Sequence, residues 1–271
     1  VRPDRISSPI TNMAAVGFVM LSPFHFCITW VSASFMQFQT PLIPARLIKR
    51  YKRFLADVQL SDGSVVTAHC ANPGSMMGLI EPDTKVWIEP NDDPRKKLKY
   101  AWRLIERDDG TMIGIDTAAA NRIVKEALEQ GQIPIPFDHF QPEVKYGDGS
   151  RVDFLLTGVD GTKTFLEVKS VTLSRQASVA EFPDSVTARG TKHLSALADQ
   201  ITQGDRAILL YLIQRTDCTS CCVAGDIDPT YAAAMADATK KGLEVLCFDT
   251  HITPERLSLG TAVPYISPAP I

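Results

Sequence analysis

The sequence has little charge excess, no repeats and no regular cysteine spacing. Its 28 Lys and Arg residues oppose 31 Asp and Glu residues, so the formal net charge of −3 gives no sign of a polyanion partner. No internal repeat or low-complexity segment is present, which excludes repeat architectures. The six cysteines, at positions 27, 70, 218, 221, 222 and 247, lack the spacing of a disulfide framework. Unpaired thiols in an otherwise ordinary composition predict a reducing, cytoplasmic location.

The cysteines at 218, 221 and 222 are close enough together to resemble half of a zinc site. A structural zinc site takes four ligands, usually in two pairs, and no second pair follows at a suitable distance. We therefore favour unpaired thiols over a structural metal at this position.

The first 35 residues contain a long apolar segment. The run Met13–Phe35 follows Arg2 and Arg5, so it resembles a signal peptide or a short membrane span. The alternative is that translation begins at Met36 and that the upstream residues come from a start codon placed too early, which an initial valine fits. We favour the second interpretation, so we expect residues 1–35 to be a non-native extension and the protein to have no membrane partner.

Charge divides the rest of the chain into two regions. The chain has 271 residues, 45% apolar and 22% charged, which is enough for one large domain or two modest ones. Residues 40–115 carry 12 Lys and Arg against 10 Asp and Glu, and residues 116–271 carry 14 against 20. The net charges are therefore +2 and −6. The first region attracts polyanions better, and the acidic excess of the second suits a cation site.

Residues 36–115 have the pattern of a small β-barrel. Short segments of β-forming residues alternate with glycine turns, of which Asp62-Gly63 and Asp109-Gly110 are the clearest. The expected strands are Tyr51–Leu60, Ser64–Cys70, Thr84–Glu89, Tyr100–Ile105 and Thr111–Ile115. Five short strands in this length fit an OB-type barrel best.

Basic and aromatic residues are interleaved at the edges of this barrel. The basic residues are Arg46, Lys49, Arg50, Lys52 and Arg53, followed by Arg95, Lys96, Lys97, Lys99 and Arg103. The aromatic residues are Tyr51, Phe54, Tyr100 and Trp102. Cations that follow phosphates and rings that stack on bases are what single-strand binding requires, so the first basic cluster is predicted to bind nucleic acid. A barrel with a core of aromatic rings and solvated lysines explains the pattern equally well.

Residues 116–271 have a different pattern, in which helices alternate with strands. A helix is expected from Thr117, as its cap, to Gln130, with Gly131 ending it. Two more helices are expected, near Val186–Gln203 and from Pro229 to Gly242. The expected strands are Phe140–Tyr146, Arg151–Leu156, Phe165–Val171, Arg206–Ile213 and Leu243–Asp249. This order predicts an α/β (α+β mixed) fold with a mixed sheet flanked by helices.

Two of these strands carry charged residues in otherwise apolar sequence. Glu167 and Lys169 share one face of their strand, and Asp153 lies on the adjacent strand of the same hairpin. Paired carboxylates repel unless a cation lies between them, so Asp153 and Glu167 are predicted to bind Mg²⁺ or Mn²⁺. A lysine beside them can orient water or stabilise charge developing on phosphate, which metal-assisted phosphodiester hydrolysis requires. The alternative is that these residues are structural, with a cross-strand salt bridge between Lys169 and Asp153 or Glu167.

Other residues are weaker candidates for this site. Glu126 lies in the middle of the helix before the sheet and could supply another catalytic carboxylate, although a mid-helix glutamate is usually solvated. Arg189, Lys192 and His193 share a face of a later helix and could contact the substrate phosphate. A lone histidine, however, is more often an ordinary surface or core residue.

Seven motifs extend in order over nearly the whole chain. They are Leu47–Val58 (LIKRYKRFLADV), His69–Met76 (HCANPGSM), Glu143–Gly147 (EVKYG), Arg151–Phe154 (RVDF), Leu166–Thr172 (LEVKSVT), Phe182–Gly190 (FPDSVTARG) and Lys192-His193. In these motifs the chain resembles the sugar fermentation stimulation protein A family of bacteria and archaea. Members of that family typically begin near Met36.

The resemblance implies an OB-type domain at residues 36–115 joined to a PD-(D/E)xK nuclease-like, restriction-endonuclease-like domain at residues 116–271. The corresponding core positions of the second domain are Asp153, Glu167 and Lys169. The family is described as DNA-binding, with a regulatory role in sugar (maltose) metabolism suggested for it.

Two functions are consistent with this reading, and a third, that of a membrane-tethered protein, depends on residues 13–35 being part of the native chain. The first is a metal-dependent nuclease, a hydrolase whose barrel holds DNA or single-stranded nucleic acid. The second is a non-catalytic DNA-binding regulator of sugar (maltose) metabolism genes on a nuclease fold. The intact core positions favour the first. The sequence departs from the family pattern at Ala71 and Pro73, where proline and threonine are expected, and this affects the local turn only.

Overall fold

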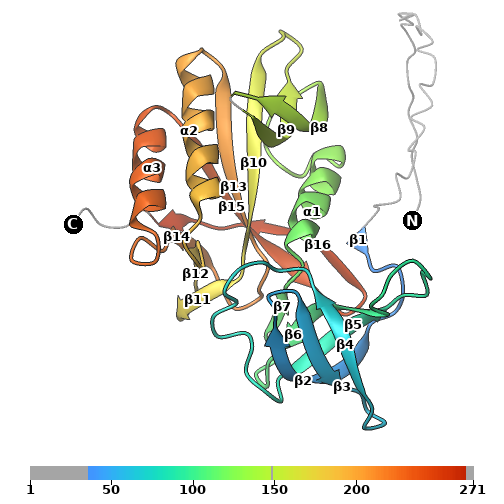
Figure 1. Ribbon diagram of the computed structural model, residues 1–271. Coiled ribbons are helices and arrows are strands. Elements are labelled where there is room, and N and C mark those ends of the chain that lie inside the picture. Colours follow the sequence, from blue (N-terminus) through green and yellow to red (C-terminus); the bar gives the residue numbers. More distant parts are fainter. Residues whose placement is uncertain (1–35, 148, 267–271) are drawn as a thin grey trace, which may run out of the picture. The chain divides into compact units, whose positions relative to one another are not determined.

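The computed structural model describes residues 36–147 and 149–266 (Figure 1). The expectations for residues 1–35 lie outside the described residues. Within the described ranges, no helix is both long and apolar enough to cross a membrane.

The first region forms a closed five-stranded barrel. Its strands are β2 (Ile43–Tyr51), β3 (Leu55–Gln59), β4 (Val65–Cys70), β5 (Lys85–Pro90) and β6 (Tyr100–Glu106), and β7 (Met112–Gly114) extends the sheet beyond β6. The order β4-β3-β2-β5-β6 is antiparallel, and a parallel pairing of β4 with β6 closes it. Inward-facing residues such as Ala56 and Val58 are fully buried. The OB-type barrel expected from the sequence is confirmed.

The first two barrel strands differ from the expected single strand Tyr51–Leu60. β2 ends at Tyr51, and β3 begins only at Leu55. Between them Lys52 and Arg53 adopt positive φ angles of 50° and 63°. Tight turns of this kind normally carry Asn or Gly, so nothing in the sequence signalled the turn.

The second region is built on a seven-stranded mixed sheet in the order β1-β16-β15-β13-β10-β9-β8. Its strands are β1 (Met36–Gln37), β8 (His139–Tyr146), β9 (Ser150–Thr157), β10 (Lys163–Val171), β13 (Arg206–Ile213), β15 (Glu244–Ile252) and β16 (Arg256–Ala262). The central strand β13 is apolar and buried from Ala207 to Ile213, as expected for a strand covered on both faces. The predicted mixed sheet is confirmed.

Three helices cover the two faces of this sheet (Figure 1). α1 (Thr117–Glu129) packs its buried residues with Leu166 and Val168 of β10. α2 (Ala188–Thr202) and α3 (Pro229–Lys240) pack together with Phe165, on the other face of the same strand. β10 therefore lies between two hydrophobic cores, and Glu167 in the middle of the strand is buried.

The helix starts follow from capping side chains. Asp116, rather than the expected Thr117, caps α1 and accepts a hydrogen bond from the amide of Ala118. Thr187 caps α2, which begins two residues after the expected Val186. The expected start of α3 at proline is confirmed, and the preceding aspartate is its cap.

A second, smaller sheet was not expected from the sequence. It consists of β11 (Leu173–Gln176), β12 (Val179–Phe182), β14 (Ser220–Val223) and β17 (Tyr265–Ile266). Cys221 and Cys222 lie on β14, and the described cysteines are all free. No cluster of three or more His, Cys, Asp or Glu side chains suited to a metal occurs within the described ranges.

The barrel and the mixed sheet belong to one compact unit and are joined by hydrogen bonds. Ser75 Oγ donates to the carbonyl of Asp184 at 2.7 Å, and the Met76 amide donates to Asp184 Oδ2 at 3.0 Å. A side chain at Gly74 would have its Cβ 2.2 Å from the same carboxylate. The segment His69–Met76 is therefore a docking turn between the two regions, and it needs glycine at position 74 for its close approach to Asp184.

Candidate active site

The β9–β10 ladder brings the two expected carboxylates together. Its last paired residues are Leu166 and Phe154, so the next pair in register is Glu167 opposite Asp153. At this position a side-chain hydrogen bond takes the place of backbone pairing: the Val168 amide donates to Asp153 Oδ2 at 2.7 Å. The two carboxylates are therefore neighbours on adjacent strands, and their binding of a cation stays a prediction.

Glu167 is buried and its two oxygens have different surroundings. Its side chain is 2% exposed. Oε1 accepts a hydrogen bond from Lys169 Nζ at 2.6 Å and contacts Nδ1 of His193 from α2. Oε2 is buried and has no hydrogen-bond partner within the described chain. Leaving a charged oxygen buried without a partner is costly, so this atom is suited to a ligand.

Asp153 is held from the opposite face of the sheet. Asn121 of α1 donates from Nδ2 to Asp153 Oδ1 at 2.7 Å. Burial, and then the nearby charge of Glu167, raise the pKa of Asp153 to about 6. Two helices on different faces of the sheet therefore each fix one carboxylate through a polar side chain.

The pKa of Glu167 shifts in the other direction. Burial acts to raise it, but the hydrogen bonds and charges of His193 and Lys169 outweigh burial and lower the pKa of Glu167 below its ordinary value. The buried Tyr146 hydroxyl, which has no partner within the described chain, has a raised pKa because of burial and then the charges of Glu167 and Asp153. The site thus stabilises the ionised form of Glu167 and disfavours ionisation of Asp153.

His193 and Asn121 were not identified by the sequence as contacts of the carboxylates. Arg189 donates from Nε to His193 Nε2 at 3.3 Å, which leaves the proton of the imidazole on Nδ1 to face Glu167. The shared helix face of Arg189, Lys192 and His193 was the only sequence signal, and it was read as a phosphate contact. Lys192 is exposed and lines a separate groove beside Ser195.

Glu126 does not join the carboxylates through any contact that the structure gives. It accepts a hydrogen bond from Gln130 Nε2 at 3.1 Å and lies beside the backbone of Met36. Five residues separate it from Asn121, which turns it about 140° around the helix from the residue that contacts Asp153. Its catalytic role stays a prediction.

The basic residues from Arg46 to Arg53 are of two kinds: some donate hydrogen bonds to the docking turn, and others are exposed to solvent. Arg50 donates from Nη2 to the carbonyls of Asn72 and Gly74 at 2.8 and 3.0 Å, and Arg53 Nη2 reaches the carbonyl of Pro73 at 3.3 Å. Arg50 therefore holds the docking turn in shape. A mainly structural role for this arginine was not foreseen from the sequence.

The other basic residues of the cluster are more open to solvent. Arg46 donates to the carbonyl of Asp83 at 2.8 Å, and Lys49 Nζ lies 3.7 Å from Asp57 Oδ2. Lys52 is exposed, and its side chain forms no ion pair with any described residue. Their binding of nucleic acid stays a prediction.

The oxygens at the site suit a hard divalent cation. Mg²⁺ is usually held by one or two carboxylates, with water and substrate phosphate completing its shell. Asp153 and Glu167 offer that number of carboxylates, and Glu167 Oε2 is already desolvated without a partner. The residues present therefore fit such a cation.

Comparison with known proteins assigns the family. The model of the sugar fermentation stimulation protein RE domain matches residues 118–256, and the SfsA N-terminal OB domain matches residues 48–115. The chain belongs to the sugar fermentation stimulation protein family. A family homolog from Roseobacter denitrificans is 58% identical over 232 residues, covering 84% of this chain and 99% of the relative. One from a Ruegeria species is 59% identical over 231 residues, covering 84% and 100%.

A solved structure of the same family shares the fold. Pyrococcus furiosus SfsA in complex with Ca²⁺ matches 86% of this chain and 99% of its own with a TM-score of 0.76. The sequence identity is 22%, so this likeness concerns the fold alone. The family expected from the motifs is confirmed.

Proposed function

We propose that this protein hydrolyses phosphodiester bonds in DNA with a divalent cation held by Asp153 and Glu167. The observation that carries the proposal is the buried Glu167 Oε2, which has no partner in the described chain and lies beside a second carboxylate and a lysine. The arrangement fits the PD-(D/E)xK pattern.

The choice of cation follows from the ligands. Both side chains offer oxygen only, which favours Mg²⁺ or Mn²⁺ over softer metals. The Pyrococcus furiosus relative was solved in complex with Ca²⁺, another oxygen-seeking cation, and this is consistent with a divalent ion as the ligand here. When bound, the cation would neutralise phosphate charge and lower the pKa of an attacking water.

The chain's own residues would prepare this chemistry. Lys169 Nζ, 2.6 Å from Glu167 Oε1, is placed to hold a water or to stabilise negative charge on the phosphate as the P–O bond breaks. His193 and Lys169 both occupy Oε1, which leaves Oε2 for the cation. Asn121 and the Val168 amide fix the plane of the Asp153 carboxylate.

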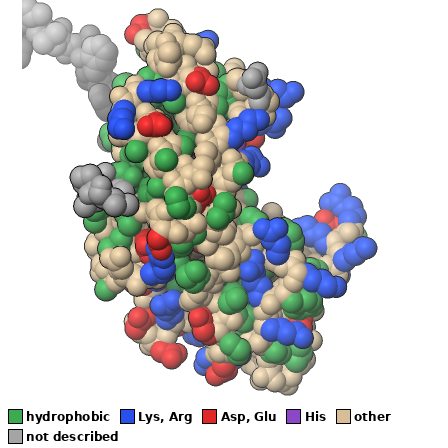
Figure 2. Space-filling model, turned by 60° about the vertical axis from the view of Figure 1, so that its left-hand side comes forward, with side chains coloured by type: hydrophobic (Ala, Val, Ile, Leu, Met, Phe, Trp, Pro, Cys, Tyr) green, Lys and Arg blue, Asp and Glu red, His purple; other side chains and the backbone are tan. Residues whose placement is uncertain are grey.

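The surface charge supports nucleic acid as the substrate. Figure 2 shows Lys and Arg side chains on both sides of a hollow in the face it presents. Lys52 is exposed without an ion pair inside the described chain, and Arg53 lies next to it. Cations of this kind bind phosphates independently of sequence.

Lys169→Ala tests the proposal by separating binding from cutting. The parent should cleave labelled DNA with Mg²⁺ or Mn²⁺, and the variant should lose about 100-fold or more of that rate while keeping its affinity for DNA. Equal rates for the two proteins would refute the assigned site. DNA binding without cutting by the parent under any cation would instead favour the non-catalytic regulator.

A further inference from the structure

The four aromatic residues interleaved with the barrel's basic residues have different environments. Trp102 is fully buried, and Tyr100 packs against the barrel core. Tyr51 is half-buried, its hydroxyl donates to Asp57 Oδ1 at 3.0 Å, and Lys49 Nζ lies over its ring. Phe54 is 44% exposed. Of these four rings, Phe54 is the most exposed and therefore the one most available for stacking.

The turn that carries Phe54 is held in a strained conformation. Lys52 and Arg53 before it both have left-handed backbone angles, which non-glycine residues adopt at a cost. Hydrogen bonds brace it: the Phe54 amide donates to the Lys52 carbonyl at 2.8 Å, and the Cys70 amide donates to the Phe54 carbonyl at 2.9 Å. Arg50 Nε also donates to the Arg53 carbonyl at 3.1 Å. The ring is therefore presented to solvent on a rigid support.

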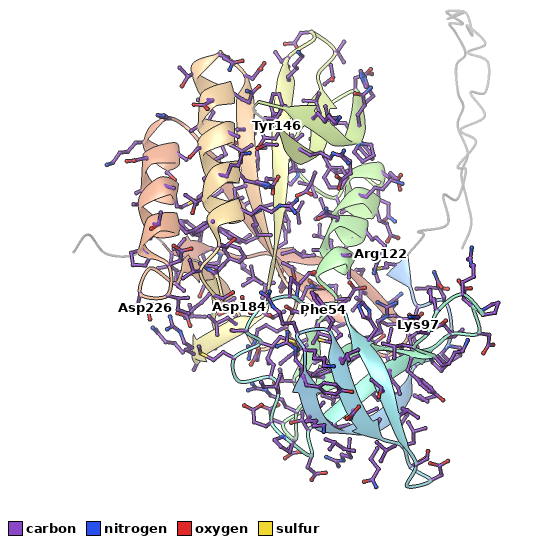
Figure 3. All side chains as sticks on the ribbon, in the orientation of Figure 1. Phe54, Lys97, Arg122, Tyr146, Asp184 and Asp226 are labelled. Atoms are coloured by element: carbon purple, nitrogen blue, oxygen red, sulfur yellow. The ribbon has the colours of Figure 1, made fainter. Side chains whose placement is uncertain are left out.

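The turn borders a cavity that reaches strand β10. Arg53 lines a cavity of about 270 Å³ together with Ser170 and Thr187. Ser170 directly follows Lys169 on β10, and Thr187 caps α2. Figure 3 labels Phe54 at the end of the barrel that faces the mixed sheet. A strand whose base lies on Phe54 would thus continue past Arg53 toward β10.

The positive charges beside the Phe54 ring are complementary to the phosphate of a nucleotide. Lys52 and Arg53 are exposed, so cations flank the ring within the same turn. An aromatic face supplies stacking to any base, and the adjacent cations supply contacts to the backbone phosphates. A base within a duplex is stacked on its neighbours and cannot lie flat on a protein ring unless it is unpaired.

We propose that Phe54 stacks on the base of an unpaired nucleotide, so that the substrate of the Asp153–Glu167 site contains a single-stranded segment. This inference rests on the proposed function for its binding of nucleic acid, and it adds the class of substrate.

The test compares Phe54→Ala, Phe54→Trp and the parent for binding to a single-stranded oligonucleotide and to a blunt duplex of the same length. The oligonucleotide contains 2-aminopurine, whose fluorescence is quenched by stacking. Phe54→Ala should weaken single-strand binding about 5- to 150-fold and abolish the quenching, because one base–ring stack contributes that much. Phe54→Trp should restore both, and duplex binding should be unchanged in either variant.

Val65→Ala is the matched control. Val65 is an apolar residue of the same barrel, is 58% exposed at the start of β4, and pairs with the last residue of β3, at the end of that strand opposite to Phe54. This variant should bind both ligands as the parent does. Unchanged single-strand binding by Phe54→Ala, or an equal loss on the duplex, would overturn the inference and leave the nuclease proposal standing. Binding of neither ligand by the parent would overturn both proposals.

Discussion

Glu167 and Asp153 are neighbours with opposite titration behaviour. The partners of Glu167 are cations and donors, so it is stabilised as a carboxylate inside the protein. Burial, and then repulsion by that charge, raise the pKa of Asp153 to about 6. A protein without a ligand at this place would be more stable with a neutral residue at 153, which is typical of sites selected for binding rather than for stability.

Asp153→Asn should therefore stabilise the cation-free protein. A carboxyl with a raised native pKa stabilises the fold fully below its unfolded pKa, near 3.8, and that contribution is lost as pH rises through about 6. The difference in free energy of unfolding, variant minus parent, should be about 1–3 kcal/mol larger at pH 7.5 than at pH 4, because only the parent ionises a buried carboxyl over that range. Urea denaturation at both pH values checks this, and a constant difference between them would contradict it.

His193 should act on the cation through Glu167. Its imidazole contacts Glu167 Oε1, so its removal frees the carboxylate to rotate. His193→Ala should weaken Mn²⁺ binding about 10-fold or more, and His193→Gln, which keeps a donor, should recover part of the affinity. Calorimetric titration of the protein without DNA measures this. Equal affinities for all three proteins would show that His193 only packs the helix.

Among the elements, the strands and helices with strong periodicity were predictable and the turns were not. The alternation in Phe165–Val171 was enough to place Glu167 and Lys169 on one face. The turn at Lys52 and Arg53 has no glycine or asparagine, so it was read as continuous strand. The helix partners His193 and Asn121 could not be predicted, because their contacts depend on how α1 and α2 cross the sheet.

The docking turn should depend on the absence of a side chain at Gly74. Gly74→Ala should lower the unfolding temperature, because the new Cβ overlaps the carboxylate of Asp184. In an Asp184→Ala background the same substitution should cost much less, since the clash is gone. Thermal unfolding of the four proteins of this cycle tests the contact. If the changes in unfolding temperature caused by Gly74→Ala and Asp184→Ala simply added in the double variant, a direct clash between the two residues would be contradicted.

Across the whole molecule, the basic residues of the barrel divide into Arg50, which makes internal contacts, and Lys52, which is exposed and is predicted to bind phosphate. Lys52→Ala should weaken DNA binding and reduce the slope of log affinity against log salt by about 1. Arg50→Ala should instead lower the unfolding temperature, because the docking turn loses its donors. Lys163→Ala, an exposed residue at the start of β10, is the control and should change neither quantity. An unchanged slope for Lys52→Ala would move the binding face elsewhere.

The central claim is that Asp153 and Glu167, together with a divalent cation, hydrolyse phosphodiester bonds in DNA. It is tested most directly by incubating labelled single- and double-stranded DNA with the protein begun at Met36, with EDTA, Mg²⁺ or Mn²⁺, beside Asp153→Ala. We predict cutting that needs the cation and is lost in the variant. Cutting that persists in EDTA or in Asp153→Ala, or tight binding with no cutting under any of these conditions, would contradict the claim.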